Sequence, residues 1–131
     1  MNKSTAKKSH VILLVEDDPL IRKITGDELT ASGFIVHEAA DGEAALEVIL
    51  KRKVDLVLLD ILLPKKDGLT VLRELKEKKK IPQLPVYILS SLSDMEKVAE
   101  GVSLGARGYF VKQNQGREEM ITAVKRLFDK S

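Results

Sequence analysis

Four charged side chains directly follow short apolar runs of the kind that form buried strands: Glu16, Asp17, Asp60 and Lys112. The runs that they follow are residues 11–15, 54–59 and 109–111. Open sheets of parallel strands place their chemistry just beyond the carboxyl ends of the strands. If these strands lie side by side, three carboxylates and one ammonium group converge on one small pocket.

The three acids suit a hard divalent cation. Mg²⁺ takes oxygen ligands, commonly one or two carboxylates together with waters and phosphate oxygens. Without a cation the acids repel one another, so the pKa of at least one should rise. The alternative is that Asp17 or Asp18 only caps the following helix. The Asp18-Pro19 pair favours a cap at Asp18, whereas three acids in succession favour a metal site at Glu16 and Asp17.

Asp60 is the candidate acceptor of a phosphoryl group. A carboxylate nucleophile needs no general base, and aspartyl phosphates are an established class of intermediate. Lys112 would pair with the phosphate or with Asp60 as a point charge. Ser90 follows a further apolar run, residues 86–89, and can donate its hydroxyl to a phosphate oxygen. The alternatives are a plain metal ligand at Asp60, a solvated surface lysine at Lys112 and a turn former at Ser90.

Five apolar runs alternate with longer amphipathic segments. The expected strands are residues 11–15, 34–38, 56–59, 86–89 and 109–111. They are largely apolar and most do not alternate with polar residues, which indicates a parallel sheet covered on both faces. Five strand–helix units predict a doubly wound α/β fold with right-handed crossovers. The residues alone leave the strand order open.

Residues that typically begin and end helices lie between these expected strands. Expected helices begin after Asp18, after Asp41, near Gly68 and after Ser93 or Asp94. Gly33 is placed to end the first helix near residue 32. The last helix carries an apolar stripe made of Met120, Val124, Leu127 and Phe128.

Composition favours one globular domain. The chain has 131 residues, 22 basic and 20 acidic side chains, and no cysteine. The charge balance gives no reason to expect polyanion binding, and disulfide and thiol chemistry are excluded. A polar start predicts a disordered leader at residues 1–9 and a domain at residues 10–131. No apolar run approaches the ~20 residues that cross a bilayer, so we expect a cytoplasmic protein.

Five segments, taken in order, resemble the receiver domain of bacterial response regulators: LLVEDDP at 13–19, DLVLLDILLP at 55–64, Asp67-Gly68, PVYILSS at 85–91 and GARGYFVK at 105–112. The resemblance extends from about His10 to Lys130. It implies a flavodoxin-like (βα)₅ sheet of strand order 2-1-3-4-5. It also implies a phosphoacceptor of a two-component phosphorelay, a signalling protein rather than an enzyme.

The resemblance assigns roles around the acids. Asp60 matches the aspartate that accepts a phosphoryl group from a phosphohistidine, and it also contacts Mg²⁺. Asp17 matches a direct Mg²⁺ ligand, and Glu16 matches an acid that binds the ion through water. Leu62 matches the residue whose backbone carbonyl is a further ligand.

The resemblance also implies a switch and its partners. Ser90 matches the switch hydroxyl, Tyr109 the aromatic side chain that swings inward and Lys112 the phosphate-pairing lysine. The partners would be a sensor histidine kinase or phosphotransfer protein, and a downstream protein on the face formed by the fourth helix, the fifth strand and the fifth helix. No nucleic-acid or membrane contact is expected of this domain, which would be a monomer or a phosphorylation-dependent dimer.

One residue departs from the family pattern, and one inference goes beyond the match. Family members usually carry proline after the lysine, often through a cis bond, whereas Gln113 stands here; a cis bond before a non-proline residue costs ~2.5–4 kcal/mol. Leu62 and Leu92, two residues beyond Asp60 and Ser90, cannot orient an attacking water. We therefore expect slow loss of the phosphoryl group.

Other classes fit less well. A dehalogenase-type aspartyl enzyme needs an aspartate where Leu62 stands, and a flavodoxin needs a phosphate-binding loop where residues 16–19 stand. The main alternative is a pseudo-receiver, which works as an interaction module without phosphorylation. Whether the domain is free-standing or part of a longer protein is left open.

Overall fold

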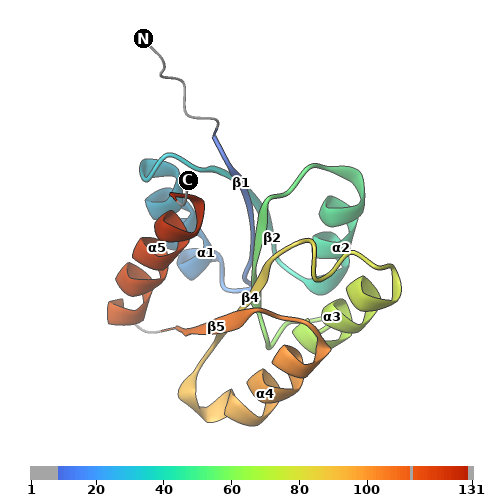
Figure 1. Ribbon diagram of the computed structural model, residues 1–131. Coiled ribbons are helices and arrows are strands. Elements are labelled where there is room, and N and C mark those ends of the chain that lie inside the picture. The colour runs from blue at the N-terminus through green and yellow to red at the C-terminus, as the bar shows by residue number, and fades with distance from the viewer. Residues whose placement is uncertain (1–8, 113, 130–131) are drawn as a thin grey trace.

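The structure, a computed structural model, describes residues 9–112 and 114–129 (Figure 1). The strands are β1 (Val11–Val15), β2 (Ile35–Ala39), β3 (Leu56–Asp60), β4 (Val86–Ser90) and β5 (Gly108–Val111). The helices are α1 (Pro19–Ala31), α2 (Gly42–Lys51), α3 (Gly68–Glu77), α4 (Met95–Leu104) and α5 (Asn114–Phe128), with a 3₁₀ turn at Leu92–Asp94. The expected leader, apart from Ser9, lies outside the described residues, as does Gln113.

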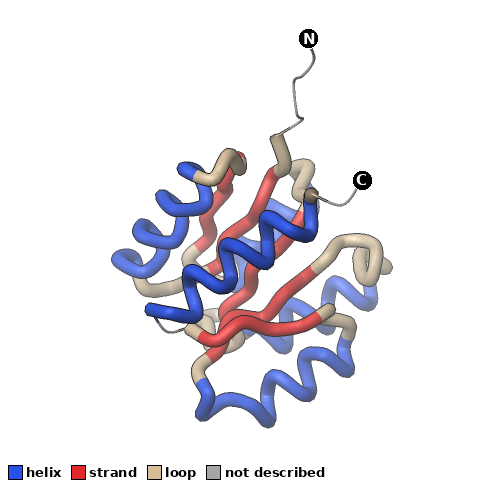
Figure 2. The backbone as a smooth tube through the Cα atoms, turned by 60° about the vertical axis from the view of Figure 1, so that its left-hand side comes forward, coloured by secondary structure: helices blue, strands red, loops and turns tan. Residues whose placement is uncertain are grey.

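The five strands form one parallel sheet in the order β2-β1-β3-β4-β5. This confirms the expected flavodoxin-like (βα)₅ fold and strand order. Helices α1 and α5 cover one face, and α2, α3 and α4 cover the other (Figure 1). In Figure 2 the helix nearest the C mark, α5, crosses in front of the sheet.

Burial on both faces explains why the strands are apolar throughout. In β1, Ile12 and Leu14 belong to the core beneath α1 and α5, whereas Leu13 and Val15 belong to the core beneath α2, α3 and α4. All four side chains are fully buried. A central parallel strand therefore needs apolar residues at consecutive positions.

The helix that follows β1 begins as its sequence predicts. Asp18 accepts hydrogen bonds from the backbone N–H groups of Leu20 (2.9 Å) and Ile21 (3.1 Å), and Pro19 is the first helical residue. Gly33 follows the helix with φ of 99°, a left-handed conformation that glycine adopts at little cost. The Asp18 cap therefore fixes where the loop after β1 ends, and Gly33 allows the turn that leads from α1 to β2.

Some expected boundaries were wrong by one residue. Asp60 and Ser90 are the last residues of their strands rather than the first of a loop, because the parallel ladder continues through them: Asp60 pairs with Leu89, and Ser90 pairs with Val111. β2 begins at Ile35 rather than Phe34, because the Phe34 N–H donates to the carbonyl of Leu29 and so closes the turn after α1.

The start of the fourth helix also differs from the expected cap. Asp94 occupies the N-cap position of α4, but its side chain makes no capping hydrogen bond there. Its carboxylate instead accepts from the Ser91 hydroxyl at 2.9 Å, inside the loop that leads from β4. None of the helices in the described ranges is long and apolar enough to cross a membrane.

Candidate functional site

Asp60 lies at the carboxyl end of the central strand β3, with 3% of its surface exposed. One carboxylate oxygen, Oδ1, accepts from the backbone N–H of Leu62 at 3.0 Å. The other, Oδ2, accepts from the Lys112 ammonium group at 2.8 Å. Two strands that are not neighbours, β3 and β5, thus bring together residues 52 positions apart. The expected convergence of Asp60 and Lys112 is present.

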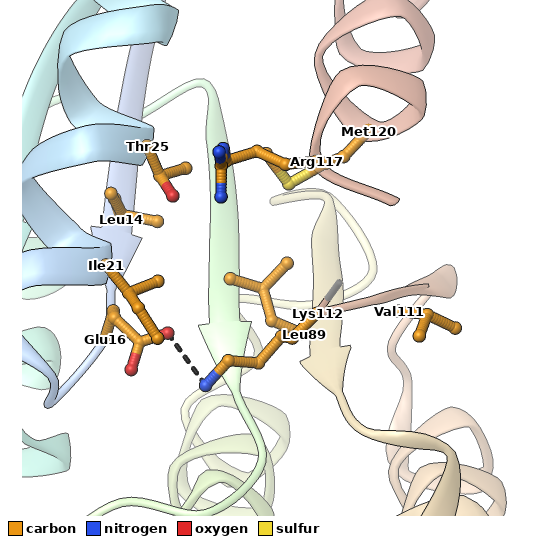
Figure 3. A pocket seen from close by; sticks show the side chains of 9 residues that line it. All are labelled: Leu14, Glu16, Ile21, Thr25, Leu89, Val111, Lys112, Arg117 and Met120. Carbon is orange, nitrogen blue, oxygen red and sulfur yellow. Dashed lines mark ion pairs between the residues drawn. The ribbon is translucent and has the colours of Figure 1, made fainter. Parts of the chain in front are cut away.

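Glu16 extends the same charge cluster from the end of β1. It is only 1% exposed, and its Oε2 accepts from the Asp18 N–H at 3.1 Å. Its Oε1 lies 2.8 Å from Lys112 Nζ (Figure 3). That contact is an ion pair without hydrogen-bond geometry, so Oε1 has no hydrogen-bond partner among the described residues.

The electrostatics of the cluster agree with this crowding. Burial raises the pKa of Glu16 to about 7, and the charge of Asp60 acts in the same direction, while contacts to Lys112 and Asp18 oppose it. Burial alone would lower the pKa of Lys112, but its hydrogen bond to Asp60 and its close contact with the Glu16 carboxylate raise that pKa above the ordinary value. The cluster therefore holds one shared ammonium group between two buried acids.

A third acid completes a set that can ligate a metal ion. Glu16, Asp17 and Asp60 each offer a carboxylate oxygen, and these oxygens all lie within 4.8 Å of one another. Asp17 is exposed, whereas the other two are buried. The backbone of Leu62 borders the set through its hydrogen bond to Asp60, and the Leu62 side chain is 45% exposed.

The two expected switch residues lie in contrasting environments. Ser90 is 1% exposed, and its hydroxyl has no hydrogen-bond partner among the described residues. Tyr109, on the neighbouring edge strand β5, is 44% exposed. Beyond Ser90, the Ser91 hydroxyl contacts both Ser93 (2.8 Å) and Asp94 (2.9 Å), which gives the loop its own hydrogen bonds.

Sequence reasoning missed one residue of the site, Arg22. Its guanidinium donates to the backbone carbonyl of Glu16 at 2.8 Å and to the Glu38 carboxylate on β2 at 3.3 Å. It therefore ties the end of β1 to α1 and β2. The sequence gives little sign of this role. A positive charge near the start of a helix is unfavourable to the helix dipole, and no motif or spacing pattern points to a lone arginine.

Sequence comparison agrees with the fold and with the acid cluster. The profile described as "Response regulator receiver domain" matches residues 12–125. The chain belongs to the response regulator receiver domain family. Receiver domains bind Mg²⁺ at an acidic cluster and work with histidine kinases, and Glu16, Asp17 and Asp60 form such a cluster here.

Curated relatives carry the receiver domain within longer proteins. The chain is 38% identical to the gliding motility regulatory protein of Myxococcus xanthus over 97% of its own length, but spans 16% of that protein. It is 33% identical to the DNA-binding dual master transcriptional regulator RpaA of Synechocystis, covering 88% of this chain and 48% of RpaA. The chain thus spans half or less of the length of these relatives.

Solved receiver domains share the whole fold. The receiver domain of NtrX from Brucella abortus superposes with a TM-score of 0.79 at 32% identity, covering 92% of this chain and 99% of that one. The chemotaxis response regulator CheY4 of Vibrio cholerae gives a TM-score of 0.82 at 27% identity, covering 92% and 99%. The sequence leaves open whether the Lys112–Gln113 peptide bond is cis, and Gln113 lies outside the described ranges.

Proposed function

We propose that this receiver domain accepts a phosphoryl group on Asp60 from a phosphohistidine of a sensor histidine kinase or phosphotransfer protein, with Mg²⁺ present. The observation that carries the proposal is the cluster itself. Asp60 and Glu16 are buried within reach of one ammonium group, and Asp17 supplies a third oxygen ligand. Buried like charges are costly unless they are paired. A site that binds a divalent cation and accepts a phosphoryl group gives this arrangement a function.

The donor set fits Mg²⁺. Hard divalent ions of this kind take carboxylate and carbonyl oxygens and retain waters. Asp17, Asp60 and the Leu62 carbonyl would hold the ion directly, and Glu16 would hold it through water. When bound, the ion supplies positive charge that offsets repulsion between the acids and an incoming phosphoryl group.

The transfer itself needs little from the protein beyond position and charge. A carboxylate oxygen of Asp60 forms the new O–P bond, the N–P bond of the phosphohistidine breaks, and the electron pair returns to the imidazole. Lys112 Nζ, now 2.8 Å from Asp60, is near enough to pair with the transferred anion. The Asp60 carboxylate remains oriented by the Leu62 N–H during this exchange.

The signal would then spread through Ser90 and Tyr109. A phosphoryl group on Asp60 adds negative charge and acceptor oxygens beside strand β4, and the unpaired Ser90 hydroxyl can donate to one of them. Its movement vacates space toward which the exposed Tyr109 can turn. The face built from α4, β5 and α5 then changes its affinity for a downstream protein, as a shift between two populated states.

The proposal is tested by labelling the purified chain with a small phosphodonor and Mg²⁺, followed by mass spectrometry of the Asp60 peptide. We expect one phosphoryl group per chain, lost when Mg²⁺ is chelated. Asp60→Asn should abolish labelling. Asp67→Asn is the matched control, because Asp67 caps α3 through the Thr70 N–H and asparagine caps almost as well. An unlabelled wild-type chain that still binds a partner protein would favour the pseudo-receiver instead.

A further inference from the structure

A cavity of about 110 Å³ lies between α1 and α5, on the face of the sheet that these helices cover (Figure 3). Its walls are mainly apolar: Leu14 of β1, Ile21 of α1, Leu89 of β4 and Met120 of α5. Glu16 and Lys112 form one end of it, so the cavity adjoins the acid cluster without including Asp17 or Asp60. The cavity itself is not used in the function proposed above, although it shares Glu16 and Lys112 with that site.

The size of the cavity limits what it can hold. An apolar protein cavity of about 150 Å³ binds benzene and remains free of water. A space of about 110 Å³ is smaller, so a six-membered ring is the upper limit of what it can hold, with part of the ligand reaching its open side. Water is the competing occupant, but water beside leucine, isoleucine and methionine side chains is poorly held, and an apolar group that displaces it gains affinity.

One polar atom at the end of the cavity lacks a hydrogen bond. Glu16 Oε1 is buried and faces the ammonium group of Lys112 without accepting a hydrogen bond from any described residue. A buried acceptor of this kind gains from any donor that reaches it. A hydroxyl group on an otherwise apolar ligand would satisfy it.

Two cations border the same space, which favours an aromatic ring over a saturated one. Figure 3 shows the side chains of Lys112 and Arg117 on either side of the open region. Arg117 also pairs with Glu28, which links α5 to α1. The faces of an aromatic ring carry negative charge density and attract nearby cations.

We propose that this cavity between α1 and α5 binds a small phenol-like molecule, with its ring against Leu14, Ile21 and Met120 and its hydroxyl donating to Glu16 Oε1. Apolar walls, flanking cations and one unsatisfied buried acceptor together match a hydroxylated aromatic ring. The occupant would touch Glu16 and Lys112, two side chains of the receiver site.

The test uses phenol as the probe and the methyl groups of the cavity as reporters. The full chain, without Mg²⁺, is titrated with phenol while ¹³C–¹H methyl spectra are recorded. We expect saturable shifts of Leu14, Ile21 and Met120 in the millimolar range. Toluene lacks the hydroxyl and should bind roughly tenfold more weakly. Cyclohexanol lacks the aromatic face and should bind about two- to fivefold more weakly.

Substitutions that fill the cavity locate the site. Thr25 is buried in the cavity wall on α1, so Thr25→Leu should weaken phenol binding, and Met120→Trp should do the same from α5. Thr30→Leu is the matched control, since it makes the same change at an exposed position of the same helix. It should leave phenol binding unchanged.

Three results would overturn the proposal. They are the lack of saturable methyl shifts with phenol, equal affinity for phenol and cyclohexanol, and unchanged phenol binding in a folded filling variant. If neither filling variant folds, the ligand series on the wild-type chain still decides. Because these measurements use no Mg²⁺ and no phosphodonor, their failure is distinct from failure of phosphorylation at Asp60.

Discussion

Lys112 pairs with two buried carboxylates at once, so we expect its removal to be costly. Its ammonium group lies 2.8 Å from both Glu16 and Asp60, and those acids are 1% and 4% exposed at their side chains. Lys112→Met keeps the apolar stem and removes the charge. Breaking a buried pair from one side costs ~3–5 kcal/mol; because Lys112 itself is partly exposed, we expect a loss of about 2–3 kcal/mol in urea unfolding without Mg²⁺.

A surface ion pair supplies the control for that substitution. Lys66 contacts Glu74 at the same distance, 2.8 Å, but in a more exposed setting. Lys66→Met should therefore lower stability much less than Lys112→Met. Equal losses in the two variants would show that Lys112 contributes as an ordinary surface lysine.

At the residue scale we also expect Leu62 and Leu92 to lengthen the lifetime of the phosphorylated state. Both side chains are exposed, 45% and 62%, and neither can hydrogen-bond an attacking water. Leu62→Asn combined with Leu92→Glu places polar groups there, and positioned polar groups speed proton-coupled steps by ~10²–10⁴. We expect dephosphorylation to accelerate by roughly tenfold or more. The rate is measured as the loss of radiolabel from the phosphorylated chain. Leu20→Asn, at an apolar side chain of α1 that is 66% exposed, should leave the rate unchanged.

At the scale of the elements, aspartate caps decide where the loops around the site begin. Asp41 caps α2 by accepting from the Ala44 N–H at 2.8 Å, and this hydrogen bond lowers the pKa of Asp41. Asp41→Ala should cost about 1 kcal/mol of unfolding free energy at neutral pH, and Asp41→Asn much less. A carboxyl pKa that is lower in the folded state stabilises above its ordinary value and loses that contribution as the pH falls toward the folded value. The difference between wild type and Asp41→Ala should therefore shrink in urea titrations at pH 3; a constant difference would contradict it.

The helices and strands were predictable from the sequence only where the signals are local. Apolar runs and aspartate caps are local signals, so the five strands, the start of α1 and the position of Asp60 followed from short stretches. Strand order depends on which strands pair at long range, and it came only with the family resemblance. Arg22, which reaches across to Glu16 and Glu38, and the cavity beside Met120 depend on side-chain directions after folding, and no spacing rule reports them.

At the scale of the whole molecule, two cores support the sheet from both faces and help it to hold the repelling acids together. The strand that precedes Glu16 and the strand that ends in Asp60 are anchored by fully buried side chains such as Leu14 and Leu58 on one face and Leu13 and Leu59 on the other. The fold therefore stores the repulsion that a divalent ion would relieve.

Mg²⁺ should accordingly stabilise the entire domain. An ion that binds only the folded chain adds about 2.7 kcal/mol at a hundred times its Kd, which for a domain of this size corresponds to a rise in Tm of several degrees, on the order of 5–15 °C. Thermal unfolding with MgCl₂, against NaCl at equal ionic strength, measures it. Asp17→Asn removes the exposed carboxylate that we propose as a ligand while leaving both buried acids paired to Lys112, so the rise should largely disappear. A full rise in that variant would place the ion elsewhere on the molecule.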